Sequence, residues 1–71
     1  MSDTMKIRML AMLDEEIKEV DGSISNNRTW MLGSDSEDEI EMFIENIADL
    51  EEYRDVLLKM RDQVMKGEFN V

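Results

Sequence analysis

The chain has 71 residues, with no cysteine and no histidine, and its 18 acidic residues against 8 basic ones give a net charge of −10 at pH 7. This length allows one small domain, near the size at which a single core barely offsets chain entropy, so we expect a disulfide, a metal or a partner chain to assist it. The missing cysteines exclude disulfides and thiolate sites, and the missing histidines remove the commonest metal ligand and general base. The negative charge opposes direct binding to nucleic acid, which carries the same sign.

The composition also bears on the compartment and on cofactors. No stretch approaches the run of about 20 apolar residues that a membrane-spanning helix needs, and residues 1–4 lack the basic segment and apolar run of a secretory signal. We therefore expect a cytoplasmic protein that binds no membrane. We also expect no cofactor and no metal site.

The first apolar pattern predicts an amphipathic helix over residues 4–20. Apolar residues recur with alternating spacings of three and four at Leu10, Leu13, Ile17, Val20 and Ile24. We expect the helix to stop at Asp21-Gly22, because glycine readily takes the left-handed conformation that ends helices. Ile24 continues the pattern, which would allow one further turn. At 1.5 Å per residue the predicted helix is about 25 Å long.

Residues 21–34 are predicted to form a connector, which is longer than the roughly 2–8 residues usual between helices. Its most distinctive residues are a basic and apolar cluster of Arg28, Trp30, Met31 and Leu32. One interpretation is that Trp30 and Leu32 fold back and close the end of the hairpin near Ile40, as a hydrophobic staple does. The other is that the cluster is a binding tip, because Trp, Arg and Met are enriched at protein interfaces.

The second apolar pattern predicts a longer helix over residues 35–66. Ser36 and Glu39 have the spacing of a capping box at its start, and Lys66-Gly67 supplies a glycine stop at its end. The apolar stripe consists of Ile40, Phe43, Ile47, Leu50, Leu57 and Val64. This helix is about 46 Å long, and residues 67–71 are expected to form a frayed tail.

These elements predict an all-α fold made of one antiparallel helical hairpin, with a short helix, a loop and a long helix. The two helices differ by about 20 Å in length, so part of the longer stripe would stay uncovered. We expect two hairpins to assemble into a dimeric four-helix bundle, with a different protein partner as the main alternative. The residues expected at this oligomer interface are Leu13, Ile17, Phe43, Ile47, Leu50, Arg54, Leu57, Arg61 and Val64.

Arg54 and Arg61 occupy positions in the stripe where core residues would stand. Their stems can cover apolar surface while their charged heads reach water, or they can pair with acids across a subunit interface and fix its register. Glu16 lies among apolar residues of the first predicted helix and should face the start of the second. A contact between Glu16 and Arg54 would therefore need a second chain.

The negative charge is concentrated, because residues 35–55 contain ten acids and one base. We define the acidic ridge as Glu37, Glu41, Glu45, Asp49 and Glu52. The ridge is either a solvated face that keeps the protein soluble or a surface that binds a basic protein. Carboxylates four residues apart rise by about 6 Å along a helix, which is comparable to the repeat of phosphates along a nucleic-acid strand.

Without His and Cys, triad and thiol chemistry are excluded, and we expect a non-catalytic protein. One carboxylate pattern nevertheless stands out: Glu15-Glu16-x-x-Glu19 and Glu52-x-x-Asp55. It resembles the magnesium signature of the all-α nucleotide pyrophosphohydrolases of the MazG type. The resemblance implies grouped carboxylates that hold Mg²⁺, which in turn binds the phosphates of a nucleotide.

The sequence therefore favours a small acidic protein-interaction module, similar in profile to small inhibitors or regulators of phage type. We expect it to act as a homo-oligomer and to bind a basic protein. A nucleic-acid mimic that blocks a DNA- or RNA-binding protein is the second reading, and a Mg²⁺-dependent nucleotide pyrophosphohydrolase is the third.

Overall fold

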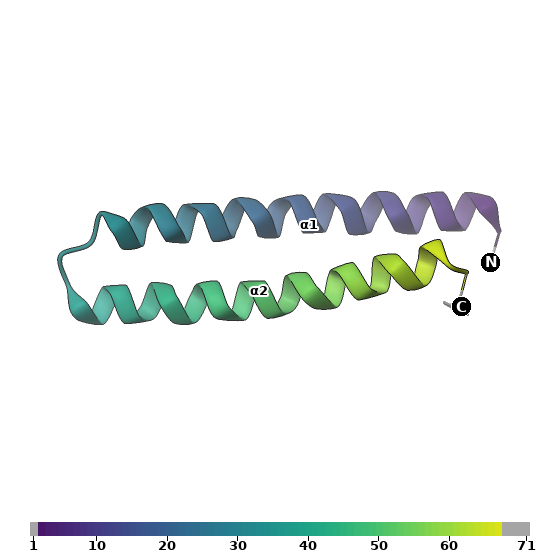
Figure 1. The fold of residues 1–71 in the computed structure, drawn as a ribbon. Helices are drawn as coiled ribbons and strands as arrows, with labels where there is room; N and C mark the ends of the chain where they lie inside the picture. The colour runs from purple at the N-terminus through teal and green to yellow at the C-terminus, as the bar shows by residue number, and fades with distance from the viewer. Residues whose placement is uncertain (1, 68–71) are drawn as a thin grey trace.

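The computed structural model describes residues 2–67, which form a hairpin of two antiparallel helices (Figure 1). Helix α1 spans Asp3–Leu32, helix α2 spans Glu37–Met65, and residues 33–36 connect them. The rod measures 51 × 15 × 13 Å. Figure 1 shows the beginning of α1 and the end of α2 at one end, which we call the open end, and residues 33–36 at the other, which we call the loop end. The expected all-α helical hairpin is thus confirmed.

The first helix extends much further than its sequence suggested. The predicted stop after Val20 and the predicted connector over residues 21–34 are wrong, because α1 runs on to Leu32 and Gly33 is its C-cap. Residues 22–29 are rich in Gly, Ser and Asn, which are weak helix formers. Packing overrides this weakness, because Ile24 and Asn27 are both buried.

Polar side chains in this segment are satisfied within the hairpin. The Asn27 amide nitrogen donates to the Ser23 carbonyl at 2.8 Å, and the Thr29 hydroxyl donates to the Ser25 carbonyl at 3.1 Å. The Asn46 amide of α2 donates to the Asn27 side-chain oxygen at 3.4 Å. Residues that would favour a loop therefore find partners inside a continuous helix.

The two helices have nearly equal lengths of 30 and 29 residues. The expected difference of about 20 Å between a short and a long helix is therefore wrong, and α1 covers α2 along most of its length (Figure 1). A longer second helix with an uncovered apolar stripe is therefore no longer an argument for a partner chain.

The signals that delimit α2 are confirmed. Ser36 is its N-cap, and its hydroxyl accepts from the Glu39 backbone N–H at 3.4 Å. The Glu39 carboxylate accepts from the Ser34 hydroxyl at 2.7 Å, and the Ser36 backbone N–H donates to the Ser34 hydroxyl at 3.4 Å instead of to Glu39. Only the first half of the predicted capping box is therefore formed. Gly67 follows the helix with a φ of 71°, in the left-handed region. Except for Gly67, the predicted tail lies outside the described residues.

The core lies in the seam between the helices. Val20, Ile24 and Leu57 form a buried cluster against which Leu13, Ile17, Ile47 and Leu50 pack. Val64 is fully buried, with 0% of its surface exposed. On α1 the seam residues follow the alternating three- and four-residue spacing of a coiled coil. On α2 the same spacing is kept only because Arg54 and Arg61 occupy two of the seam positions between the apolar residues. In the described part of the chain, neither helix has the length of apolar sequence that a bilayer crossing requires.

Candidate interaction surfaces

The residues predicted to form an oligomer interface serve the contact within one hairpin. Leu13, Ile17, Ile47, Leu50 and Leu57 belong to the core packing. Of the other four, Val64 is buried, Phe43 meets an aromatic ring of α1, and both arginines reach across to α1. A second chain would have to use other surfaces as well.

Three ion pairs bridge the two helices along one side. Their shortest distances are 2.6 Å for Arg54–Asp21, 2.6 Å for Arg61–Asp14 and 3.0 Å for Arg28–Glu51. Asp14, Asp21 and Arg28 recur every seven residues, which places them on one side of α1. We call these six residues the ion-pair flank. Arg54 and Arg61 thus find acidic partners in their own chain, and partly exposed pairs of this kind contribute about 0–1 kcal/mol each.

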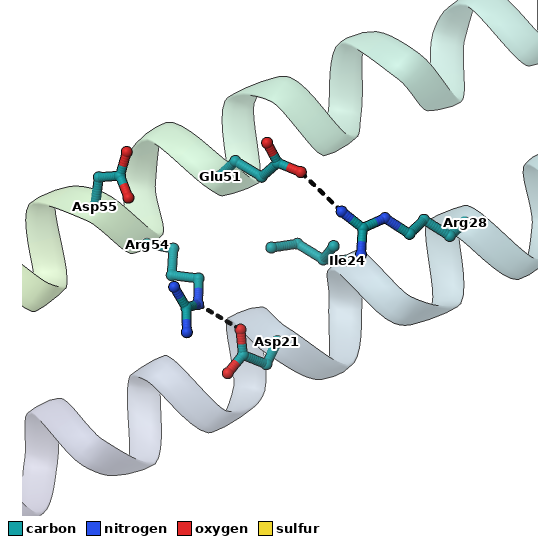
Figure 2. A pocket seen from close by; sticks show the side chains of 6 residues that line it. All are labelled: Asp21, Ile24, Arg28, Glu51, Arg54 and Asp55. Carbon is teal, nitrogen blue, oxygen red and sulfur yellow. Dashed lines mark hydrogen bonds and ion pairs between the residues drawn. The ribbon is translucent and has the colours of Figure 1, made fainter.

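A cleft of about 320 Å³ opens in the ion-pair flank, lined by Asp21, Ile24, Arg28, Glu51, Arg54 and Asp55. In Figure 2 the Ile24 side chain lies between the Arg28–Glu51 and Arg54–Asp21 pairs. The lining has three carboxylates against two guanidinium groups. The charges largely neutralise one another, so this cleft presents no strong field of one sign.

Glu16 faces a different part of α2 from the one expected. The hydroxyl of Tyr53 donates to the Glu16 carboxylate at 3.1 Å, so the prediction that Glu16 faces the start of the second helix is wrong. Glu16 lies opposite Tyr53, which directly precedes Arg54 in the sequence. The hydrogen bond to Glu16 raises the pKa of Tyr53, and desolvation and the negative charge of Glu16 add to the effect.

A group of methionines covers the open end on the side of Glu16 and Tyr53. We define the methionine flank as Met5, Met9, Met12 and Met60. Met9, Met12 and Met60, together with Leu13, line an apolar cleft of about 140 Å³. Met12 is 72% exposed and Met5 is 45% exposed. The spacing of Met5, Met9 and Met12 predicts that they widen the apolar face of the first helix, and Met5 and Met12 stay exposed beside the seam.

The predicted loop cluster lies in the last turns of α1 and not in a loop. Trp30 contacts Phe43 of α2 with ring centroids 6.2 Å apart at 46°, yet 56% of its surface stays exposed. Arg28 is held by Glu51, Met31 is half-buried and Leu32 is 83% exposed. Trp30 therefore makes a closing contact near the loop end, with Phe43 rather than near Ile40, and Leu32 does not fold back.

The acidic ridge stays open to solvent. Its five residues are all exposed. Among residues 2–67 none of them takes part in an ion pair, because the four ion pairs there involve other acids. The ridge extends along one uninterrupted helix, α2, over about 22 Å at 1.5 Å per residue. Glu45 and Glu52 fall seven residues apart on the side of α2 opposite its seam positions.

The carboxylates that resemble a magnesium signature do not gather at one place. Glu16 is bonded to Tyr53, and Glu15, Glu19, Glu52 and Asp55 are all exposed. Within residues 2–67 no group of three or more acidic side chains is placed to hold a metal ion.

No family model, curated protein or solved structure matches this chain.

Proposed function

We propose that this chain is a small, acidic, non-catalytic protein-interaction module that acts as an inhibitor or regulator by binding a basic surface of another protein. The observation that carries the proposal is the state of the acidic ridge, whose five carboxylates are exposed. Arg28, Arg54, Arg61 and Lys66 pair with acids outside the ridge. The ridge charges are thus left for a partner.

The arrangement of the ridge suits such a role. Like charges four residues apart disfavour a helix by a few tenths of a kcal/mol per pair, and a basic partner would remove this cost. The ridge is held on a single helix whose start is fixed by the Ser36 cap. Electrostatic complementarity of this kind speeds association and makes it sensitive to salt.

Affinity capture from the native host tests the proposal, because the identity of the partner is the missing quantity. We expect the wild-type chain to capture proteins with basic surfaces, which moderate salt elutes. The ridge variant Glu45→Gln/Glu52→Gln should lose most of this capture. The control Glu15→Gln/Glu19→Gln removes the same charge from exposed positions on α1 and should retain it. Equal capture by both variants would contradict a role for the ridge.

We also propose that the hairpin acts as a homo-oligomer, with two hairpins forming a four-helix bundle. The exposed surface supports this, because the chain exposes 5452 Å². A compact protein of 8.4 kDa would expose about 4,600 Å². The excess of roughly 850 Å² follows from the elongated 51 × 15 × 13 Å shape of the hairpin, whose long sides a second hairpin could cover.

A second candidate function is mimicry of nucleic acid. It is favoured by the regular spacing of the ridge along the unbroken α2. The same capture experiment distinguishes it, because a mimic should retain DNA- or RNA-binding proteins, and added nucleic acid should displace them. Captured basic proteins that nucleic acid does not displace would reject mimicry and leave the first proposal standing.

A further inference from the structure

We propose that the cleft in the ion-pair flank, about 320 Å³ in volume, binds one arginine side chain of the basic protein partner. This inference rests on the proposed function and deepens it, because it names a residue type of the partner and the place that receives it. Asp55 lines the cleft and follows Glu52 of the acidic ridge by three residues, so the two carboxylates are neighbours on the surface of α2. A partner bound along the ridge can therefore reach the cleft with one side chain.

The lining of the cleft carries one negative charge in excess. Its three carboxylates belong to Asp21, Glu51 and Asp55, and its two guanidinium groups belong to Arg28 and Arg54. Arg54 pairs with Asp21 at 2.6 Å, and Arg28 pairs with Glu51 at 3.0 Å. Within residues 2–67 the Asp55 carboxylate has neither an ion pair nor a hydrogen bond (Figure 2). The cleft therefore lacks one positive charge.

A cation fits this lining better than an anion does. Both arginines already bind a carboxylate, so an anion would have to displace Asp21 or Glu51, whereas a cation leaves both pairs in place. Glu51 and Asp55 are four residues apart on α2, and like charges at that spacing disfavour a helix. A positive group bound between them removes this repulsion. One charge is sufficient, because only Asp55 is without a partner.

The floor of the cleft is apolar and can receive the stem of an arginine. Ile24 lies there between the two ion pairs (Figure 2), and the methylene groups of arginine pack on apolar surface while the charged head stays among polar groups. A guanidinium is planar, more weakly hydrated than the ammonium of lysine, and donates in several directions. It can therefore reach both Asp55 and Glu51, which uses only its Oε1 atom for Arg28.

The test uses arginine with both backbone ends blocked, N-acetyl-arginine amide, whose single charge is the guanidinium. The matched control is N-acetyl-citrulline amide, which has nearly the same shape and no charge. Binding to the isotope-labelled full chain is followed by the backbone amide signals in nuclear magnetic resonance. We expect capped arginine at millimolar concentration to shift the signals of residues around the cleft, and capped citrulline to leave them in place. No shift with capped arginine, or an equal shift with both compounds, overturns the inference.

A pair of variants tests the position of the site. Asp55→Asn removes the unpaired charge and should raise the dissociation constant of capped arginine about two- to fivefold. Glu15→Gln removes the same charge from an exposed position of α1 and should leave that constant unchanged. Asp55→Asn breaks no side-chain contact in the described part of the chain, and circular dichroism checks that both variants keep their helix content. Equal weakening by both would show an effect of net charge alone and overturn the cleft as the site.

Ethylguanidinium distinguishes a protein side chain from a free small cation, because it has the charged head and a short stem but no backbone. If it shifts the signals at the cleft and capped arginine does not, the partner's side chain is rejected as the ligand. Capture by the ridge variant Glu45→Gln/Glu52→Gln is a separate measurement. Loss of capture without binding of capped arginine would keep the proposed function and overturn the cleft. Binding of capped arginine with undiminished capture would keep the cleft and overturn the ridge.

Discussion

Gly22 is the residue at which local preference and packing disagree most. It lies inside α1, where glycine costs roughly 0.5–1 kcal/mol relative to alanine. A Cβ added at Gly22 would meet no atom within 4 Å. We expect Gly22→Ala to raise the free energy of unfolding by about 0.5–1 kcal/mol, measured by urea denaturation.

The control for this prediction is Gly67→Ala. Gly67 has a φ of 71°, which an alanine adopts at a cost of about 1–2 kcal/mol, so this variant should be less stable than the wild type. A loss of stability in Gly22→Ala as well would show that the chain is not helical at Gly22.

Tyr53 links stability to pH at the alkaline end. Its hydrogen bond to Glu16 raises the pKa of Tyr53 above the usual value of 10.0. A raised pKa in the folded chain means that the protonated phenol stabilises the fold. This contribution is complete below pH 10 and is lost as the pH rises through the higher folded value.

We therefore expect the stability of the wild type to fall more steeply above pH 10 than that of Tyr53→Phe. Because the chain has a single tyrosine, the ultraviolet absorbance of tyrosinate follows this group alone. The absorbance should rise at a higher pH than in free tyrosine, and Glu16→Gln should bring it back. An unshifted titration in the wild type would contradict the hydrogen bond.

At the scale of the helices, the ring contact between Trp30 and Phe43 joins the end of α1 to the beginning of α2. Such ring pairs contribute about 0.5–1.5 kcal/mol beyond the area they bury. We expect Trp30→Ala to lower the free energy of unfolding by about 1–2 kcal/mol, followed by circular dichroism. Leu32→Ala, at an 83% exposed position, should change it by less than about 0.5 kcal/mol. An equal effect of both substitutions would show that the ring contact is not what holds the helix end.

The two helices also show how much of the fold the sequence predicts. The bounds of α2 were predicted within about two residues, because Ser36 and Gly67 are local signals and the apolar stripe between them is regular. α1 was cut short because its pattern passes through Gly22 and through Asn27, which is polar yet buried. Whether the chain stays helical at such positions depends on packing against the neighbouring helix. The helix propensities of the residues themselves carry no information about that packing.

The same error propagated to the candidate surfaces. Which residues of two antiparallel helices face each other depends on where the turn lies, so the misplaced connector put Glu16 opposite the wrong part of α2. The cross-helix pairs of Arg54 and Arg61 were missed for this reason. The exposure of the acidic ridge can be predicted from the periodicity of a single helix, without knowing where the turn lies. In the structure all five of its acids are exposed.

For the whole molecule, the net charge of −10 should make stability depend on salt. Repulsion among the acids is screened as the Debye length falls from about 30 Å at 0.01 M to about 8 Å at 0.15 M. The exposed ion pairs are weakened too, but they contribute little. We expect the melting temperature to rise over this range, by a smaller amount in Glu45→Gln/Glu52→Gln than in the wild type. A melting temperature that falls with salt would show that the ion pairs outweigh the repulsion.

The short connection over residues 33–36 orders the cross-helix contacts by their separation along the chain. Asn27 and Asn46 are 19 residues apart, whereas Asp14 and Arg61 are 47 apart. Closing a longer loop costs more entropy, so contacts near the turn form first. The contacts between the two helices should therefore form first at the loop end. Those at the open end should form last during folding and break first during unfolding.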